Sequence, residues 1–198
     1  MTSPAPADPR TRLLAAAVDY LQHHGLGDLS LRELAAAIGT SHRMLIYHFG
    51  SKEGLLAAVV RAVEDAQRAF FAGLAADPAL GPLEVAAAMW NHLADSRLWP
   101  SERLFFEIYG QALQGRPGTE GFLDAISVAG WMPQVTGYRA RFAPSAEDAE
   151  ADARLSAAVV RGLLLELVAT GDRAAADRAF GRFIELARVA LALPREPG

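Results

Sequence analysis

Apolar residues recur every three to four positions through most of the chain, which is the spacing of an amphipathic α-helix. Near the N-terminus the pattern is short and interrupted. Because proline starts helices, serine and aspartate cap them and glycine ends them, three short helices are expected there. Their predicted limits are Asp8-Pro9 to Gly25-Leu26-Gly27, Ser30 to Gly39, and Ser41 to Gly50-Ser51.

A much longer helical pattern follows from Lys52 to about Ala76, with Ser51 as its cap. Further helices are predicted over Leu83 to Ser96, Pro100 to Gln114 and Glu120 to Phe142, the last one broken near Gly130 and Pro133. The final two, Ala146 to Thr170 and Asp172 to Leu193, are separated only by Gly171 and are expected to form an antiparallel hairpin. Since no run alternates with period two, the predicted fold class is all-α.

The charges are unevenly distributed along the chain. The total is −4, from 19 basic and 23 acidic residues, which excludes a uniformly basic surface. Residues 1–62 carry six basic against five acidic residues, whereas residues 63–198 carry thirteen against eighteen. Between Thr40 and Lys52 no residue is acidic, and the basic or titratable side chains are His42, Arg43, His48 and Lys52. This local patch can face the phosphates of a nucleic acid.

Composition also narrows the cellular setting. No cysteine occurs, which excludes disulfide bonds and thiolate metal sites. No apolar segment behind basic residues resembles a signal peptide. Apolar stretches such as Leu155 to Thr170, which contains Arg161 and Glu166, fall short of the roughly 20 residues of a membrane span. A cytoplasmic location without a membrane partner is therefore expected.

The stretch from Gly27 to Leu56 reads GDLSLRELAAAIGTSHRMLIYHFGSKEGLL, and its two short helices around a tight turn predict a helix-turn-helix. Leu45 and Phe49 are expected to turn inward. The outward surface of that helix then carries five side chains that can reach DNA: His42, Arg43, Met44, Tyr47 and His48. An arginine can bond guanine twice, histidines can bond bases or phosphates, and Met44 and Tyr47 can touch thymine methyl groups or sugars.

Within this stretch, SLRELAAAIG followed by LIYHFGSKEGLL resembles the second helix, the recognition helix and the start of the fourth helix of the tetracycline-repressor (TetR) family. The resemblance implies that Ser30, Arg32 and Lys52 contact the DNA backbone. Ile46 replaces one aromatic residue of the family's usual pair, which commonly contacts the backbone too. Three prolines and several small residues among residues 1–9 predict a flexible tail. The resemblance implies a helix-turn-helix domain (10–51) and a helical effector-binding and dimerisation domain (52–198).

The resemblance further implies a homodimeric repressor that binds palindromic double-stranded operator DNA and is released by a small, largely apolar effector. Family members generally dimerise through their last two helices. The seam expected here consists of Leu155, Val159, Gly162, Leu163, Phe180, Phe183 and Ala187. The side chains expected around the effector are Trp90, Asn91, Trp99, Phe106, Tyr109, Trp131 and Tyr138. Both sets could equally fill the core of the chain itself.

Other classes of function stay open on the sequence. An enzyme would need a site, but no G-x-S-x-G, G-x-G-x-x-G, P-loop or H-E-x-x-H motif occurs, so we predict no enzymatic activity and no cofactor. Asp19 and His23 could be ligands in a metal or haem sensor, although a histidine there more often caps the helix, and no metal site is predicted. An all-α module that docks on a protein would suit the net charge, and salt dependence separates it from a DNA-binding protein.

Overall fold

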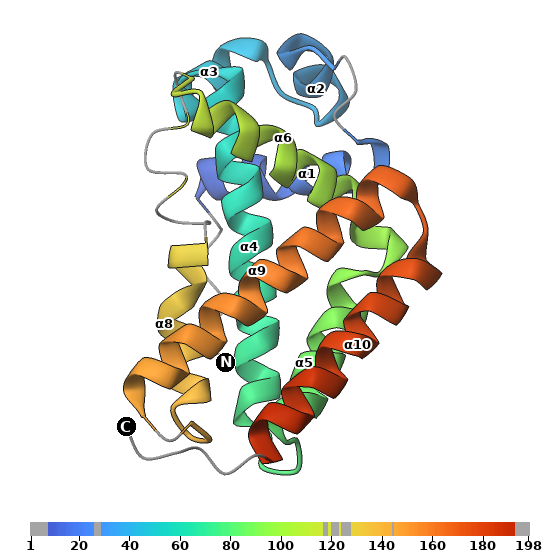
Figure 1. Ribbon diagram of the computed structural model, residues 1–198. Helices are drawn as coiled ribbons and strands as arrows, with labels where there is room; N and C mark the ends of the chain where they lie inside the picture. The colour runs from blue at the N-terminus through green and yellow to red at the C-terminus, as the bar shows by residue number, and fades with distance from the viewer. Residues whose placement is uncertain are drawn as a thin grey trace. The chain divides into compact units, whose positions relative to one another are not determined.

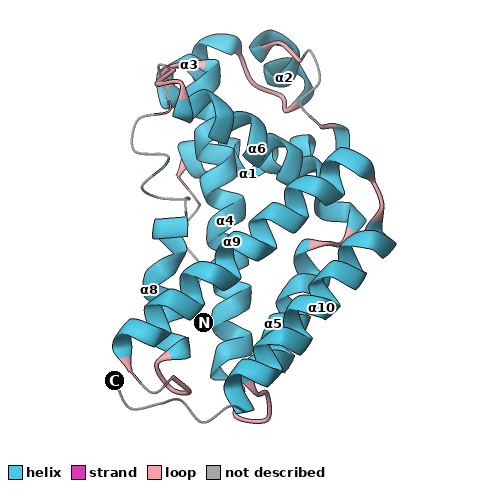
Figure 2. Cartoon of the chain, viewed as in Figure 1, coloured by secondary structure: helices cyan, strands magenta, loops and turns pink. Residues whose placement is uncertain are grey.

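The computed structural model describes residues 8–25, 29–116, 119, 123, 128–143 and 145–192, and every regular element in these ranges is a helix (Figure 2). The all-α prediction is confirmed. In chain order (Figure 1), the helices are α1 (Pro9–His24), α2 (Leu31–Ala37), α3 (His42–Phe49), α4 (Lys52–Ala76), α5 (Pro82–Leu93), the short 3₁₀ helix η1 (Ser96–Leu98), α6 (Trp99–Leu113), α8 (Val128–Arg139), α9 (Ala146–Thr170) and α10 (Arg173–Ala192).

Local signals set the starts of α2, α3 and α4 as predicted. Helix α1 begins with Pro9 in its first turn, but the side chain of Asp8, the expected cap, makes no capping hydrogen bond. Ser30 caps α2 by accepting a hydrogen bond from the N–H of Glu33 at 3.2 Å, and its own N–H donates to the Glu33 carboxylate at 2.8 Å. This reciprocal pair is a capping box. Ser51 caps α4 in a simpler way, through the N–H of Gly54 at 3.0 Å.

The chain divides into two compact units, and the first contains residues 1–67 and 97–127. It combines α1, α2, α3 and α6 with the first part of α4 around one apolar core. Four members of that core have no exposed surface: Ala17, Leu45, Leu55 and Ile108. Leu55 lies on α4 and Ile108 on α6, so residues on both sides of the predicted domain boundary after Ser51 pack in the same core. That residues 10–51 bind DNA and residues 52–198 bind an effector and dimerise stays a prediction.

The second unit contains residues 68–96 and 128–198. In it α8 packs on α9, and α10 packs on α9 and α5. Gly171 joins α9 to α10 with a left-handed φ of 72°, and the two helices run in opposite directions from this turn, as predicted (Figure 1). Asp172 accepts a hydrogen bond from the N–H of Ala175 at 2.8 Å and so begins α10.

Helix α8 corrects the prediction of a break near Gly130 and Pro133. Both residues lie inside one continuous helix, Val128–Arg139. Proline lacks the N–H that would bond one turn back, so it disfavours this position. Packing compensates, because α8 lies along α9 and buries Trp131 and Tyr138.

Several predictions fall outside the described residues. These are the tail through Ala7, Leu26 and Gly27 of the predicted helix stop, most of the predicted helix between Glu120 and Ser127, and Leu193. Of the helices that are described, none is both long enough and apolar enough to cross a membrane.

Candidate functional site

The turn between α2 and α3 is built around a glycine. Gly39 adopts a left-handed φ of 71°, which L side chains rarely adopt. Its N–H donates to the carbonyl of Ala36 at 3.3 Å, and the N–H of Thr40 donates to that of Ala35 at 2.8 Å. This pair of bonds is the Schellman arrangement, which ends α2 and sets the direction in which the chain enters α3.

Helix α3 presents most of its surface to solvent. Ser41 caps it by accepting a hydrogen bond from the N–H of Met44 at 3.2 Å. Leu45 and Phe49 turn inward as predicted and are 0% and 9% exposed. Four of the five side chains predicted to reach DNA are exposed: His42, Arg43, Met44 and Tyr47. Tyr47 is 79% exposed, so its ring contributes little to the core and is available to a partner.

His48 is placed differently from those four. Its side chain is half-buried, and its Nε2 atom is shielded from solvent without a hydrogen-bond partner. Its carbonyl accepts a hydrogen bond from Nε of Arg10 on α1 at 3.4 Å. DNA contact by His48 stays a prediction, and contact through Nε2 would require the ring to turn. Arg10 was not singled out in the sequence, because no local pattern links residues 38 positions apart.

The residues expected at the DNA backbone lie around the start of α2 and of α4. Ser30 caps α2, Arg32 is exposed in its first turn, and Lys52 is the first residue of α4. Hydrogen bonds from the side chain and the backbone of Ser30 lower the pKa of Glu33, and the positive charge of Lys52 lowers it further. Lys52 is therefore near enough to α2 for its charge to act there, and Arg32 and Lys52 are two cations in this region.

The seven side chains predicted around an effector divide between the two units. The members in the first unit lie on α6 and are Trp99, Phe106 and Tyr109. The members in the second unit lie on α5 and α8 and are Trp90, Asn91, Trp131 and Tyr138. On α6, Phe105 is buried, and its ring centroid lies 5.1 Å from that of Phe106 and 5.7 Å from that of Tyr109.

In the second unit, Phe71 of α4 gathers two of the predicted aromatic residues. Its ring centroid lies 6.2 Å from that of Trp131 and 5.8 Å from that of Tyr138, both in edge-to-face geometry. The hydroxyl of Tyr138 is buried and has no hydrogen-bond partner. Burial raises the pKa of Tyr138, so the hydroxyl keeps its proton and can still donate a hydrogen bond.

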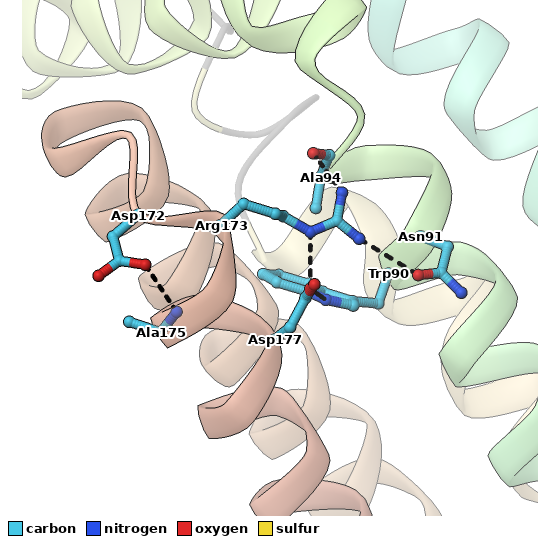
Figure 3. A network of polar contacts seen from close by, with 7 residues as sticks. All are labelled: Trp90, Asn91, Ala94, Asp172, Arg173, Ala175 and Asp177. Carbon is cyan, nitrogen blue, oxygen red and sulfur yellow. Dashed lines mark hydrogen bonds and ion pairs between the residues drawn. The ribbon is translucent and has the colours of Figure 1, made fainter.

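Trp90 and Asn91 belong to a polar network that joins the end of α5 to the start of α10 (Figure 3). The indole N–H of Trp90 and Nε of Arg173 both donate to Oδ1 of Asp177, each at 2.7 Å. Arg173 also donates to the carbonyl of Ala94 at 2.8 Å and to the amide oxygen of Asn91 at 3.3 Å. These bonds give Trp90 and Asn91 a part in holding the unit together, whatever else they contact.

The side chains predicted for a dimer seam differ in exposure. On α9, Leu155 is 57% exposed and Gly162 is also exposed. Phe180 on α10 is only 5% exposed, because its ring stacks on Trp90 with centroids 4.9 Å apart. The half-buried members are Val159, Leu163, Phe183 and Ala187.

Three further apolar side chains on these helices were not predicted. Leu165 on α9 is 50% exposed, and Leu186 and Val189 on α10 are 55% and 57% exposed. Leu165 follows Leu155 by ten residues, which is about 2.8 helical turns, so the two side chains point about 80° apart around α9. The helical period therefore does not place Leu165 in line with Leu155.

The pair considered as metal ligands on α1 lies at the end of that helix. Nδ1 of His23 is 2.7 Å from the carbonyl oxygen of Asp19, and Nδ1 of His24 is 2.9 Å from that of Tyr20. Both imidazoles thus lie within hydrogen-bonding distance of carbonyl groups in the last turns of α1. Among the described residues, no group of three or more histidine, cysteine, aspartate or glutamate side chains could hold a metal.

Comparison with known proteins agrees with this arrangement. Residues 13–59, from α1 into α4, match the family model described as "Bacterial regulatory proteins, tetR family". The HTH-type transcriptional regulatory protein RaaS of Mycobacterium tuberculosis (strain ATCC 25618 / H37Rv) is 48% identical over 44 residues, which are 22% of this chain and 20% of that protein. The chain therefore spans about a fifth of the length of this curated relative.

Solved structures extend the likeness to almost the whole chain. A TetR transcriptional regulator from Legionella pneumophila superposes with a TM-score of 0.65 at 20% identity, covering 92% of this chain and 98% of its own. The multidrug binding protein EbrR, complexed with imidazole, superposes with a TM-score of 0.63 at 24% identity, covering 96% and 94%. At these identities the likeness concerns the fold, which is an N-terminal helix-turn-helix followed by a helical domain.

Proposed function

We propose that this chain is a TetR-type, sequence-specific DNA-binding repressor in the cytoplasm, released from its operator by a small, largely apolar effector. The match of residues 13–59 to the family model of the tetR regulatory proteins supports the DNA-binding part of this proposal. The observation that carries the proposal is α3, an exposed helix that is capped by Ser41 and shows Arg43 and Tyr47 to solvent. A helix of this kind fits the major groove of B-DNA, which is about 12 Å wide.

The side chains of the candidate site divide into two proposed roles. Arg43 bonds a guanine through its O6 and N7 atoms and so carries sequence information. Lys52, Arg32 and the Ser30 hydroxyl contact phosphates, which adds affinity without specificity. Tyr47 lies between these roles, because its ring can pack on a sugar or a thymine methyl group while its hydroxyl bonds a phosphate.

The proposed repressor is a homodimer built on α9 and α10. The support is the apolar surface that these helices leave in solvent, in particular Leu155, Leu165 and Leu186. Fully burying one leucine contributes on the order of 1.5–3 kcal/mol, so several on each copy favour association. A two-fold dimer would place two copies of α3 about 34–36 Å apart on DNA, the spacing of half-sites in a palindrome.

The proposed effector site lies in the helical domain. Support comes from the aromatic side chains around Phe71 and from the buried, unpartnered hydroxyl of Tyr138, which can donate a hydrogen bond to an apolar molecule that carries one acceptor. The similar fold of EbrR was solved with imidazole, a small ring compound. Helix α4 would couple the two events, since Lys52–Gln67 belongs to the first unit and Arg68–Ala76 to the second.

Selection of duplexes from a random-sequence pool tests the proposal directly. We expect enrichment of a palindrome whose half-sites are one helical turn apart. Fluorescence anisotropy with the selected duplex should show affinity that falls steeply as salt rises, because bound cations displace counterions. A chain that enriches no sequence, and whose DNA binding does not respond to salt, is instead a module that docks on protein.

A further inference from the structure

The last turn of α3 has carbonyl groups that the helix cannot satisfy by itself. The carbonyl of Ile46 accepts the N–H of Gly50 at 2.8 Å, as the chain leaves the helix. The carbonyl of His48 is reached from α1, by Nε of Arg10 at 3.4 Å. A positive charge at this end of a helix is also favoured by the direction of the peptide dipoles.

The same guanidinium covers an aromatic ring of α3. The Cζ atom of Arg10 lies 5.0 Å from the ring centroid of Phe49, and Phe49 is buried in the core of the first unit. A guanidinium is flat, so it can stack on a ring and donate from its edge at the same time, whereas an ammonium group is a compact point charge. Arg10 thus holds two consecutive residues of α3, one by its carbonyl and one by its ring.

We propose that Arg10 is a positioning residue for DNA reading, which holds the last turn of α3 against α1 and does not itself contact DNA. This inference rests on the proposed function. Helix α3 has eight residues, and isolated helices shorter than about 12 residues are marginal in water, so its orientation depends on contacts with its neighbours. Ser41 fixes the start of α3 and Arg10 fixes its end, which sets where Arg43 and Tyr47 point.

Amide hydrogen exchange of the free protein tests the positioning step without DNA. In Arg10→Ala, and equally in Arg10→Lys, the amides of Phe49 and Gly50 should exchange about 5- to 30-fold faster, as expected when one charged hydrogen bond and one cation–π contact are lost. The matched control is Arg12→Ala. Arg12 is exposed about half a helical turn away, and its side chain makes no hydrogen bond or ion pair with the residues that the structure describes, so the variant should leave α3 unchanged. Unchanged exchange in both Arg10 variants would overturn the proposal.

Binding to the duplex selected by the wild-type protein tests the consequence. Both Arg10 variants should lose about 5- to 30-fold in affinity for that duplex and less for a scrambled one, while the slope of log Kd against log salt stays the same. If Arg10→Lys binds like wild type and Arg10→Ala lowers the slope by about one, then Arg10 contacts phosphate and the proposal is wrong. Failure of the wild-type protein to bind any duplex would instead refute the proposed function, and the exchange data would still decide the role of Arg10 in α3.

Discussion

The exposed surface of α3 and the exposed surface of α9 and α10 differ in their chemistry. Helix α3 shows an arginine, a histidine and a tyrosine to solvent beside Met44 and Ile46, two apolar side chains that are less exposed than the tyrosine, and it carries no acidic residue. Helices α9 and α10 show leucine and valine side chains that are half exposed or more, among exposed ion pairs. A polar and basic surface loses little in water and gains from an anionic partner. An apolar surface is unfavourable in water until another surface covers it, so the two regions call for different partners on one chain.

The two surfaces are also held in place differently. Helix α3 is short and is fixed by local devices at its start and by its two inward side chains, Leu45 and Phe49. Helix α10 is fixed by bonds to distant residues, since Asp177 is reached by Trp90 from 87 positions away. The start of α3 is therefore set by neighbouring residues, whereas the apolar surface depends on contacts between residues that lie far apart in the sequence of the second unit.

The largest effect is expected from a charge in the apolar surface. Leu165→Glu should yield monomers at micromolar concentration in analytical ultracentrifugation, because a buried unpaired carboxylate opposes association. A monomer has only one helix-turn-helix, so its affinity for a duplex with two half-sites should be lower by about 100-fold or more. Ala174→Glu, an exposed position in the first turn of α10, is the control and should stay dimeric. A dimer that tolerates Leu165→Glu would place the interface elsewhere.

The next largest effects are expected from two substitutions that distinguish contact with bases from contact with phosphates. Arg43→Ala should cost about 1–3 kcal/mol on the selected duplex and relax the preference at one base pair in each half-site. Lys52→Ala should weaken the selected and scrambled duplexes about equally and lower the salt slope by about one. Anisotropy over a salt series measures both, with Arg116→Ala as control, because Arg116 is exposed and lies outside the helices proposed for DNA binding and for the dimer. Equal behaviour of Arg43→Ala on both duplexes would remove Arg43 from base reading.

The same contrast explains how much the sequence could predict. The starts of α2, α3 and α4 were predictable because Ser30, Ser41 and Ser51 each cap the helix that follows. Each serine accepts a hydrogen bond from the N–H three residues further along the chain. The inward positions of Leu45 and Phe49 followed from the helical period. These signals are local, so no knowledge of the rest of the fold was needed.

Features that depend on distant packing were not predictable in the same way. A break was expected at Pro133, but contact between α8 and α9 outweighs the missing hydrogen bond. Phe180 and Phe183 are three residues apart, so the helical period places both on one side of α10. The period does not show that Phe180 is buried within its own unit; that follows from the stacking of its ring on Trp90. The contact of the Arg10 guanidinium with α3 was also not predictable, since it joins α1 to α3 and no periodic pattern connects the two helices.

A smaller effect is expected at the network that holds α10. Asp177→Ala removes the acceptor shared by Trp90 and Arg173, and it should lower the free energy of unfolding by about 1–2 kcal/mol, because the carboxylate is partly exposed to solvent. Urea denaturation measures this change. Glu185→Ala removes an exposed ion pair with Arg182 and should cost well under about 1 kcal/mol. Equal costs for the two variants would show that the network adds nothing beyond a surface ion pair.

The smallest effect is a change in thermal stability at the capping box of α2, and it depends on pH. The pKa of Glu33 lies below its ordinary value of 4.5, because hydrogen bonds from Ser30 and the charge of Lys52 favour the carboxylate. A lowered pKa in the folded chain means that the stabilisation is complete above the ordinary pKa and is lost as the pH falls through the folded pKa. Glu33→Gln should therefore lower Tm at pH 7 by about a few degrees at most, and the difference from wild type should disappear in strong acid. Circular dichroism melts of both proteins from pH 7 downward measure it, with Glu147→Gln in the first turn of α9 as control for the loss of one acidic side chain. A difference that persists unchanged below the folded pKa would mean that the glutamine disturbs α2 by its shape, since by then both side chains are neutral.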